Sequence, residues 1–175
     1  MKDFFKKIKF NSQKGVTVVE LLLYMAILSA LLTILTSIFV SALDVQSESN
    51  TTSSVEQDGN YIIARLTYDI HRAQNINIPA ANGLPAIDNF QMVIDGVNYT
   101  YNVDVNNNLI LTNNLGVNNL NNYGTSVSAL SVQRLGNAGG IENTLRINFK
   151  VTSRTKRVSG VEIKNFQTNL SLRRQ

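Results

Sequence analysis

A single carboxylate lies at the start of a long uncharged segment near the N-terminus of this 175-residue chain. Glu20 follows Lys14 and Gly15, and no charged residue occurs from Leu21 through Leu43. An unpaired carboxylate in hydrocarbon costs several kcal/mol or takes up a proton. A charge in such a place therefore usually has a partner and a function.

The other polar residues do not have the spacing of a catalytic or metal site. The chain has no cysteine, which excludes disulfides and thiolate metal sites, and His71 is its only histidine. Residues 104–108 begin like a calcium loop, but Leu109 and Leu115 stand where the EF-hand pattern requires glycine and glutamate. We interpret residues 104–108 as a turn between strands. We therefore predict no catalytic residues, no cofactor and no metal, and a protein that is not an enzyme.

The formal net charge of +4 is located in the first 15 residues. This segment has one acidic residue, Asp3, and five lysines: Lys2, Lys6, Lys7, Lys9 and Lys14. The rest of the chain carries equal numbers of basic and acidic side chains. We interpret Arg154, Lys156, Arg157 and the terminal pair 173–174 as solvated. Because nucleic-acid binding requires clustered positive charge, no nucleic-acid partner is expected.

The uncharged segment is long enough to cross a bilayer as a helix. Its 23 residues, Leu21 to Leu43, span about 35 Å at roughly 1.5 Å per residue, and the hydrocarbon core is about 30 Å thick. Loops rich in lysine stay on the cytoplasmic side of a membrane. The lysine-rich start therefore predicts a cytoplasmic N-terminus, a single span and an extracytoplasmic chain from Asp44 onward.

Three interpretations of this segment are open on these grounds. A secretory signal peptide would be cut near Val40-Ser41-Ala42. However, the apolar regions of signal peptides are usually about 7–15 residues long, and the apolar segment here is longer and includes Glu20. A plain single-pass anchor would hold a surface domain that binds an extracellular ligand without polymerising. This second interpretation leaves Gly15 and Glu20 unexplained. The third interpretation depends on the residues that surround Gly15.

The run from Gly15 to Leu21 has the order Gly, apolar, Thr, apolar, apolar, Glu, Leu. It resembles the N-terminal cleavage and methylation motif of type IV pilins and pseudopilins. The resemblance implies that a membrane peptidase cuts after Gly15 and that the new amine of Val16 is methylated. Val16 departs from the phenylalanine most often found there. The resemblance also implies that Glu20 pairs with the Val16 amine of an adjacent subunit, whereas a Glu20 solvated among lipid headgroups is the alternative.

The resemblance further implies partners and a location. The partners are the prepilin peptidase and methylase, other pilin or pseudopilin subunits, an inner-membrane assembly platform and membrane lipid. The protein would lie in the cytoplasmic membrane and then enter a pilus or pseudopilus. Its second half is similar to the J-type minor pseudopilin of type II secretion and to the minor pilin W, which implies a minor subunit.

The helix is expected to continue beyond the membrane, because no proline occurs from Val16 to Ala73. Residues 46–60 are rich in weak helix formers and are predicted to form an exposed stalk. A sheet-facing stripe follows at helical spacing, with Arg65, Asp69 and Arg72 on other faces. The stripe consists of Ile63, Leu66, Ile70 and Ala73, widened by Tyr61, Ile62 and Tyr68. Pro79 is predicted to end the helix in a loop through Ile87.

The remaining chain has the two-residue period of strands. We predict strands at 90–94, 97–105, 109–112, 127–135, 144–153 and 161–172, with a tight turn at Asp95-Gly96, a turn at 136–140 and a polar loop at 115–125. The expected fold is α+β, a long N-terminal helix with an antiparallel sheet packed on its C-terminal half. The expected segments are the leader 1–15, the transmembrane and assembly helix 16–43, its continuation 44–74 and the sheet domain 75–175.

Overall fold

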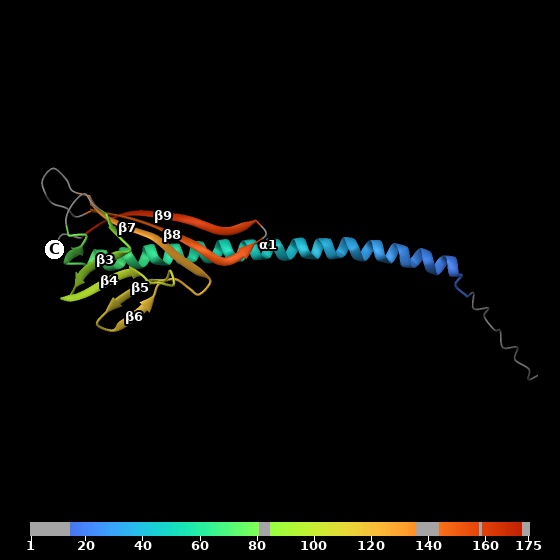
Figure 1. Ribbon diagram of the computed structural model, residues 1–175, viewed down its shortest axis with the longest axis horizontal. Helices are drawn as coiled ribbons and strands as arrows, with labels where there is room; N and C mark the ends of the chain where they lie inside the picture. Colours follow the sequence, from blue (N-terminus) through green and yellow to red (C-terminus); the bar gives the residue numbers. More distant parts are fainter. Residues whose placement is uncertain (1–14, 81–84, 136–143, 158, 173–175) are drawn as a thin grey trace, which may run out of the picture. The chain divides into compact units, whose positions relative to one another are not determined.

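The computed structural model describes residues 15–80, 85–135, 144–157 and 159–172 (Figure 1). The chain divides into two units, Met1–Leu43 and Asp44–Gln175. Helix α1, Val18–Arg72, begins in the first unit and ends in the second. The predicted turn at 136–140 and the pair 173–174 lie outside the described residues.

Helix α1 ends at Arg72, seven positions before Pro79, so the prediction that Pro79 ends it is wrong. After Arg72 the backbone forms hydrogen bonds with the sheet instead of with the helix: the Gln74 backbone N–H donates to the Val93 carbonyl at 2.9 Å. The side chain of Arg72 in the last turn contacts Asp95 at 2.8 Å. The chain then enters strand β1, a strand that was not predicted, before Pro79.

One sheet has the strand order β1-β3-β4-β5-β6 and is antiparallel throughout. Its strands are β1 Asn75–Ile78, β3 Asn89–Ile94, β4 Val97–Val103, β5 Leu109–Asn113 and β6 Gly116–Asn119. The turn between β3 and β4 is confirmed: Asp95 and Gly96 have φ of 51° and 77°, as a type I′ turn requires. Strand β6 lies in the segment 115–125, which was predicted to be a polar loop, and its residues are exposed.

The second sheet has the order β2-β7-β8-β9. Its strands are β2 Ala86–Ile87, β7 Thr125–Leu135, β8 Thr144–Arg157 and β9 Gly160–Ser171. Strand β8 confirms the predicted alternation, with buried residues at Leu145, Ile147, Phe149 and Val151. Strand β2 lies in the segment that was predicted to be a loop.

The two sheets and the C-terminal half of α1 share one apolar core (Figure 1). From the helix, Val55, Ile62, Leu66 and Ile70 are at most 1% exposed. Tyr61 and Tyr68 are about half exposed, so the predicted stripe is narrower than expected. The α+β fold is confirmed, with two antiparallel sheets in place of one.

Residues 46–60 are helical, but the exposed stalk that was predicted extends only to Asn50. Thr51, Val55, Asp58 and Gly59 are all buried. Gly59 is required for this packing, because a Cβ built on it would lie 2.0 Å from Cζ of Phe166. The Phe166 ring therefore occupies the space beside the helix backbone, and it stacks on Phe149 with centroids 5.3 Å apart. The absence of a side chain at Gly59 therefore allows Phe166 of strand β9 to pack against the helix.

Candidate functional site

The peptide bond between Gly15 and Val16 lies outside the helix and is exposed. Helix α1 begins at Val18, and Val16 is 61% exposed. No heavy atom lies within 4 Å of a Cβ built on Gly15, and its φ is outside the left-handed range. Neither packing nor backbone conformation within the described chain therefore requires glycine at this position.

Thr17 caps the helix. Its Oγ1 accepts from the backbone N–H of Glu20 at 3.2 Å, and its carbonyl accepts from the N–H of Leu21 at 3.1 Å. Thr17 and Glu20 have the spacing of a capping box, and a carboxylate in the first turn is favoured by the helix dipole. The residues around the candidate cleavage position thus also fix where the helix starts.

The Glu20 carboxylate has a partner in its own chain, Tyr24, that was not identified from the sequence. The Tyr24 hydroxyl donates to Oε1 of Glu20 at 2.7 Å, across one helical turn. The i,i+4 spacing was the available signal, because such residues face one another on a helix. The hydrogen bond leaves the second carboxylate oxygen free to accept from another molecule.

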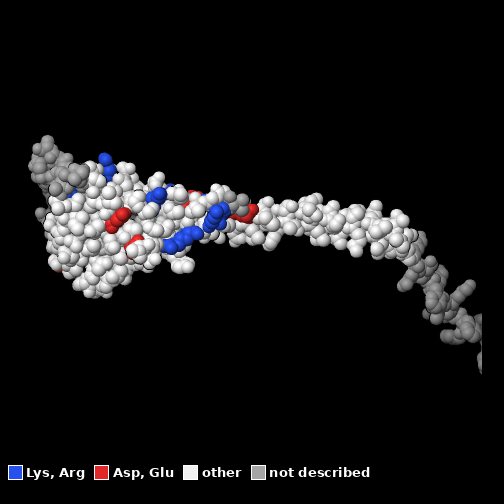
Figure 2. All heavy atoms as spheres, viewed as in Figure 1, with Lys and Arg blue, Asp and Glu red and all other residues white. Residues whose placement is uncertain are grey.

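The first half of α1 exposes an apolar surface on all sides. Every large hydrophobic side chain from Val16 to Val45 is between 47% and 75% exposed. The stretch Leu21–Leu43 has no charged residue, and Figure 2 accordingly shows a long white segment of the helix. The helix is long and apolar enough to cross a membrane. Its hydroxyl groups donate to carbonyls three or four residues earlier, as hydrocarbon requires.

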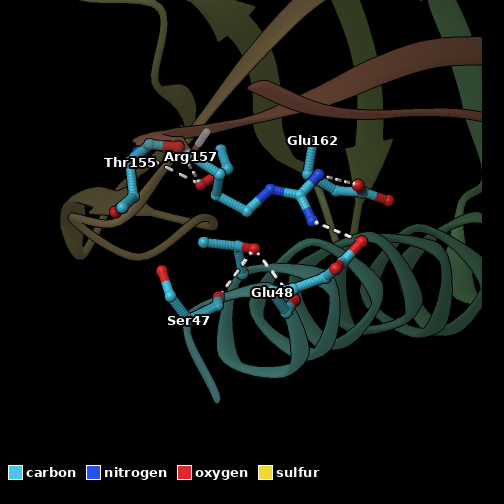
Figure 3. A network of polar contacts seen from close by, with 7 residues as sticks. Ser47, Glu48, Thr155, Arg157 and Glu162 are labelled. Carbon is cyan, nitrogen blue, oxygen red and sulfur yellow. Dashed lines mark hydrogen bonds and ion pairs between the residues drawn. The ribbon is translucent and has the colours of Figure 1, made fainter. Parts of the chain in front are cut away.

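Arg157, interpreted from the sequence as solvated, is instead part of a polar cluster between strand and helix (Figure 3). Its side chain is 9% exposed. Nη2 donates to Glu162 at 2.5 Å, and Nη1 lies 3.2 Å from Glu48 on α1. Glu162 is near in the sequence, but Glu48 lies on the distant helix, so the local sequence could not indicate that the Arg157 side chain is covered.

Asp69 was expected on a face of the helix away from the sheet, but the structure shows that it is fully buried. Its carboxylate accepts from the Tyr101 hydroxyl of β4 and, at 2.8 Å, from Nε of Arg65. Burial, with a smaller contribution from the hydrogen bond to Asp69, raises the pKa of Tyr101. This contact joins α1 to the five-stranded sheet. His71 is exposed.

These observations describe two kinds of surface with different capacities. The first half of α1 can contact lipid or other apolar helices, with Glu20 and Tyr24 as its polar pair at the start. Within the second unit, buried polar contacts and one shared core hold the two sheets on residues 44–72 of α1. Among the described residues no group of three or more His, Cys, Asp or Glu is placed to bind a metal.

The prokaryotic N-terminal methylation motif matches residues 10–36 of the chain. This motif is the prepilin signature of type IV pilins and pseudopilins, which confirms the resemblance drawn from Gly15 to Leu21. It indicates a pilin-like or pseudopilin subunit that is processed by a prepilin peptidase and assembles with other pilins. Comparison with curated proteins and with solved structures finds no match.

Proposed function

We propose that this protein is a structural subunit of a type IV pilus or a type II secretion-type pseudopilus, cut between Gly15 and Val16 and methylated on the Val16 amine. The observation that carries the proposal is the methylation motif at the start of an apolar helix that the chain itself leaves uncovered. An apolar surface of this extent marks contact with a membrane or with other protein chains. A subunit that moves from lipid into a helical filament requires both kinds of contact.

The surroundings of Gly15 support recognition by a peptidase. Glycine is needed where backbone approaches another group closely or adopts an unusual conformation. Neither requirement arises among the residues that the structure describes, where a Cβ at Gly15 would meet nothing within 4 Å. The requirement for glycine would then come from the active site of the enzyme that cuts the exposed bond.

The assembly step would place Glu20 against the positive amine of Val16 on an adjacent subunit. Glu20 lies at the helix start, within one turn of the new N-terminus, so the pair can form between neighbours that are shifted along the filament axis. An ion pair in apolar surroundings is specific in register, since a shifted neighbour would leave both charges unpaired. The Tyr24 hydrogen bond would keep Glu20 partly compensated before assembly.

The proposed topology follows from charge. Lysines before residue 15 would hold the N-terminus in the cytoplasm, where the peptidase acts, and the unit from Asp44 onward would lie outside. The inner-membrane assembly platform would then extract the subunit. We further propose a minor subunit, supported by the lack of a cysteine pair and by the J-like second half. Its abundance in sheared filaments relative to other subunits tests this assignment.

Processing is tested by the intact mass of the protein isolated from its host membrane. The expected mass corresponds to residues 16–175 with one added methyl group. An uncut chain would instead favour a single-pass anchored domain, and a chain that begins near Leu43 would indicate an ordinary signal peptide.

The assembly role is tested by replacing Glu20 with alanine, with Leu22→Ala as the control on the same apolar surface. Truncating one member of a buried charge pair costs about 2–5 kcal/mol. Incorporation into filaments should therefore fall at least about tenfold, while cleavage and membrane insertion are retained. Unchanged incorporation of Glu20→Ala would refute the pairing with Val16.

A further inference from the structure

A polar pocket lies where two loops of the five-stranded sheet meet strand β8. Its volume is about 350 Å³, and five asparagines, Tyr123 and Arg154 line it. Small-molecule sites have volumes of roughly 300–1,000 Å³. This pocket differs from an ordinary apolar site because amide groups form most of its wall.

The first loop, between β6 and β7, is held in place by hydrogen bonds to Asp58 of helix α1. Asp58 of α1 is 7% exposed and accepts from the Asn122 backbone N–H at 3.0 Å, from Asn122 Nδ2 at 3.2 Å and from the Thr125 hydroxyl. The buried Asn121 amide bonds to both Leu109 and Thr125. These bonds define the backbone of the loop before any ligand arrives, which lowers the entropy lost on binding.

The second loop, between β4 and β5, is fixed by Asp104. Its carboxylate accepts from the backbone N–H groups of Asn106 at 2.9 Å and Asn108 at 2.6 Å. Arg154 of β8 joins the two loops: Nε donates to the Thr125 carbonyl at 2.7 Å, and Nη2 donates to the Asn106 carbonyl at 2.7 Å and to Asn108 Oδ1 at 3.0 Å. The guanidinium is therefore held in one position.

Several polar groups in the pocket remain available. Within the described part of the chain, no acceptor lies at bonding distance from Nη1 of Arg154, and no carboxylate forms an ion pair with it. By contrast, Arg72 and Arg157 both contact carboxylates. The side chains of Asn119 and Tyr123 likewise make no hydrogen bond to described residues, and Tyr123 is 96% exposed.

We propose that this pocket binds a saccharide that carries a carboxylate. Amide side chains donate and accept hydrogen bonds, as sugar hydroxyls do, so both partners of each contact can be satisfied. The exposed Tyr123 ring offers a flat apolar face to the C–H side of a sugar ring. Nη1 of Arg154 supplies the charge-assisted donor for the carboxylate.

The charge of the pocket favours this ligand over a nucleic acid. Nucleic-acid binding depends on several cations that neutralise successive phosphates, and among the described residues that line the pocket only Arg154 is a cation. The proposal goes beyond filament assembly, since it assigns a ligand to a surface of the second unit and does not require polymerisation.

The test uses the full chain in detergent micelles. Binding is screened on an array of uronate- and sialate-bearing oligosaccharides that also contains neutral glycans, and a hit is titrated by calorimetry beside single-stranded DNA. The informative variants are Tyr123→Ala and Asn119→Ala, because neither side chain supports the fold. Leu115→Ala is the matched control, since Leu115 is 85% exposed and outside the pocket.

An acidic saccharide should bind, and both pocket variants should weaken it, Tyr123→Ala by at least about tenfold, while Leu115→Ala leaves affinity unchanged. In Arg154→Gln, the ratio of the affinity for the acid to the affinity for its methyl ester should fall by about tenfold or more. Three results would overturn the proposal: no acidic saccharide on the array binds, binding survives both pocket variants, or DNA binds with higher affinity than any saccharide.

Discussion

Replacing Gly59 with alanine should destabilise the protein, although the same change in an exposed helix stabilises it by about 1 kcal/mol. The new Cβ would lie 2.0 Å from Cζ of Phe166 and 2.4 Å from both Cε atoms. Ordinary contact begins at 3.4 Å, so the ring would have to retreat by about 1.4 Å. Phe166 is 8% exposed and stacks on Phe149, and small adjustments cannot relieve the clash.

The magnitude follows from displacing the ring. Losing a buried phenylalanine costs about 3–5 kcal/mol, and subtracting the helical gain leaves a net loss of about 2–4 kcal/mol. At roughly 2–4 °C per kcal/mol, Tm should fall by about 4–16 °C.

Thermal unfolding of the full chain in micelles, followed by near-ultraviolet circular dichroism, measures this shift. Asn60→Ala is the control, because Asn60 is the exposed helical neighbour of Gly59 and reports the propensity gain alone. In a Phe166→Ala background, Gly59→Ala should no longer destabilise. A Gly59→Ala protein that melts at or above the wild-type temperature would refute the packing argument.

Two further predictions concern hydroxyl groups bonded to carboxylates. Tyr24→Phe removes the intrachain donor to Glu20, so the yield of subunit in sheared filaments should fall severalfold, less than with Glu20→Ala; a wild-type yield would show that the hydroxyl has no role. Burial and the hydrogen bond to Asp69 raise the pKa of Tyr101 in the folded protein. The protonated Tyr101 hydroxyl therefore contributes fully to the free energy of unfolding below the unfolded-state pKa near 10, and this contribution is lost as pH rises above that value. Melts from about pH 8 to pH 11 should show this loss, and Tyr101→Phe should abolish it; an equal loss in the variant contradicts the assignment.

Features that depend on neighbours in the sequence were predictable. The methylation motif and the absence of charge from Leu21 to Leu43 are read directly. The Asp95-Gly96 turn follows from local backbone preference, and the alternation of β8 follows from the period of a strand that covers a core. Strand β1 has the alternating order Asn75-Ile76-Asn77-Ile78, a local signal that was missed. Strand β6 offers no such signal, and pairing with β5 forms it.

The sequence by itself determined an apolar N-terminal helix, a carboxylate at its start and a set of antiparallel strands, since each arises from residues within a few positions of one another. Only the tertiary structure decided that the strands form two sheets and that Asp58, Asp69 and Arg157 are buried. Each of these charged groups has a bonding partner far from it in the sequence: Asn122 for Asp58, Tyr101 for Asp69 and Glu48 for Arg157. A charged side chain can be buried only where such partners meet it, and the fold alone brings them together.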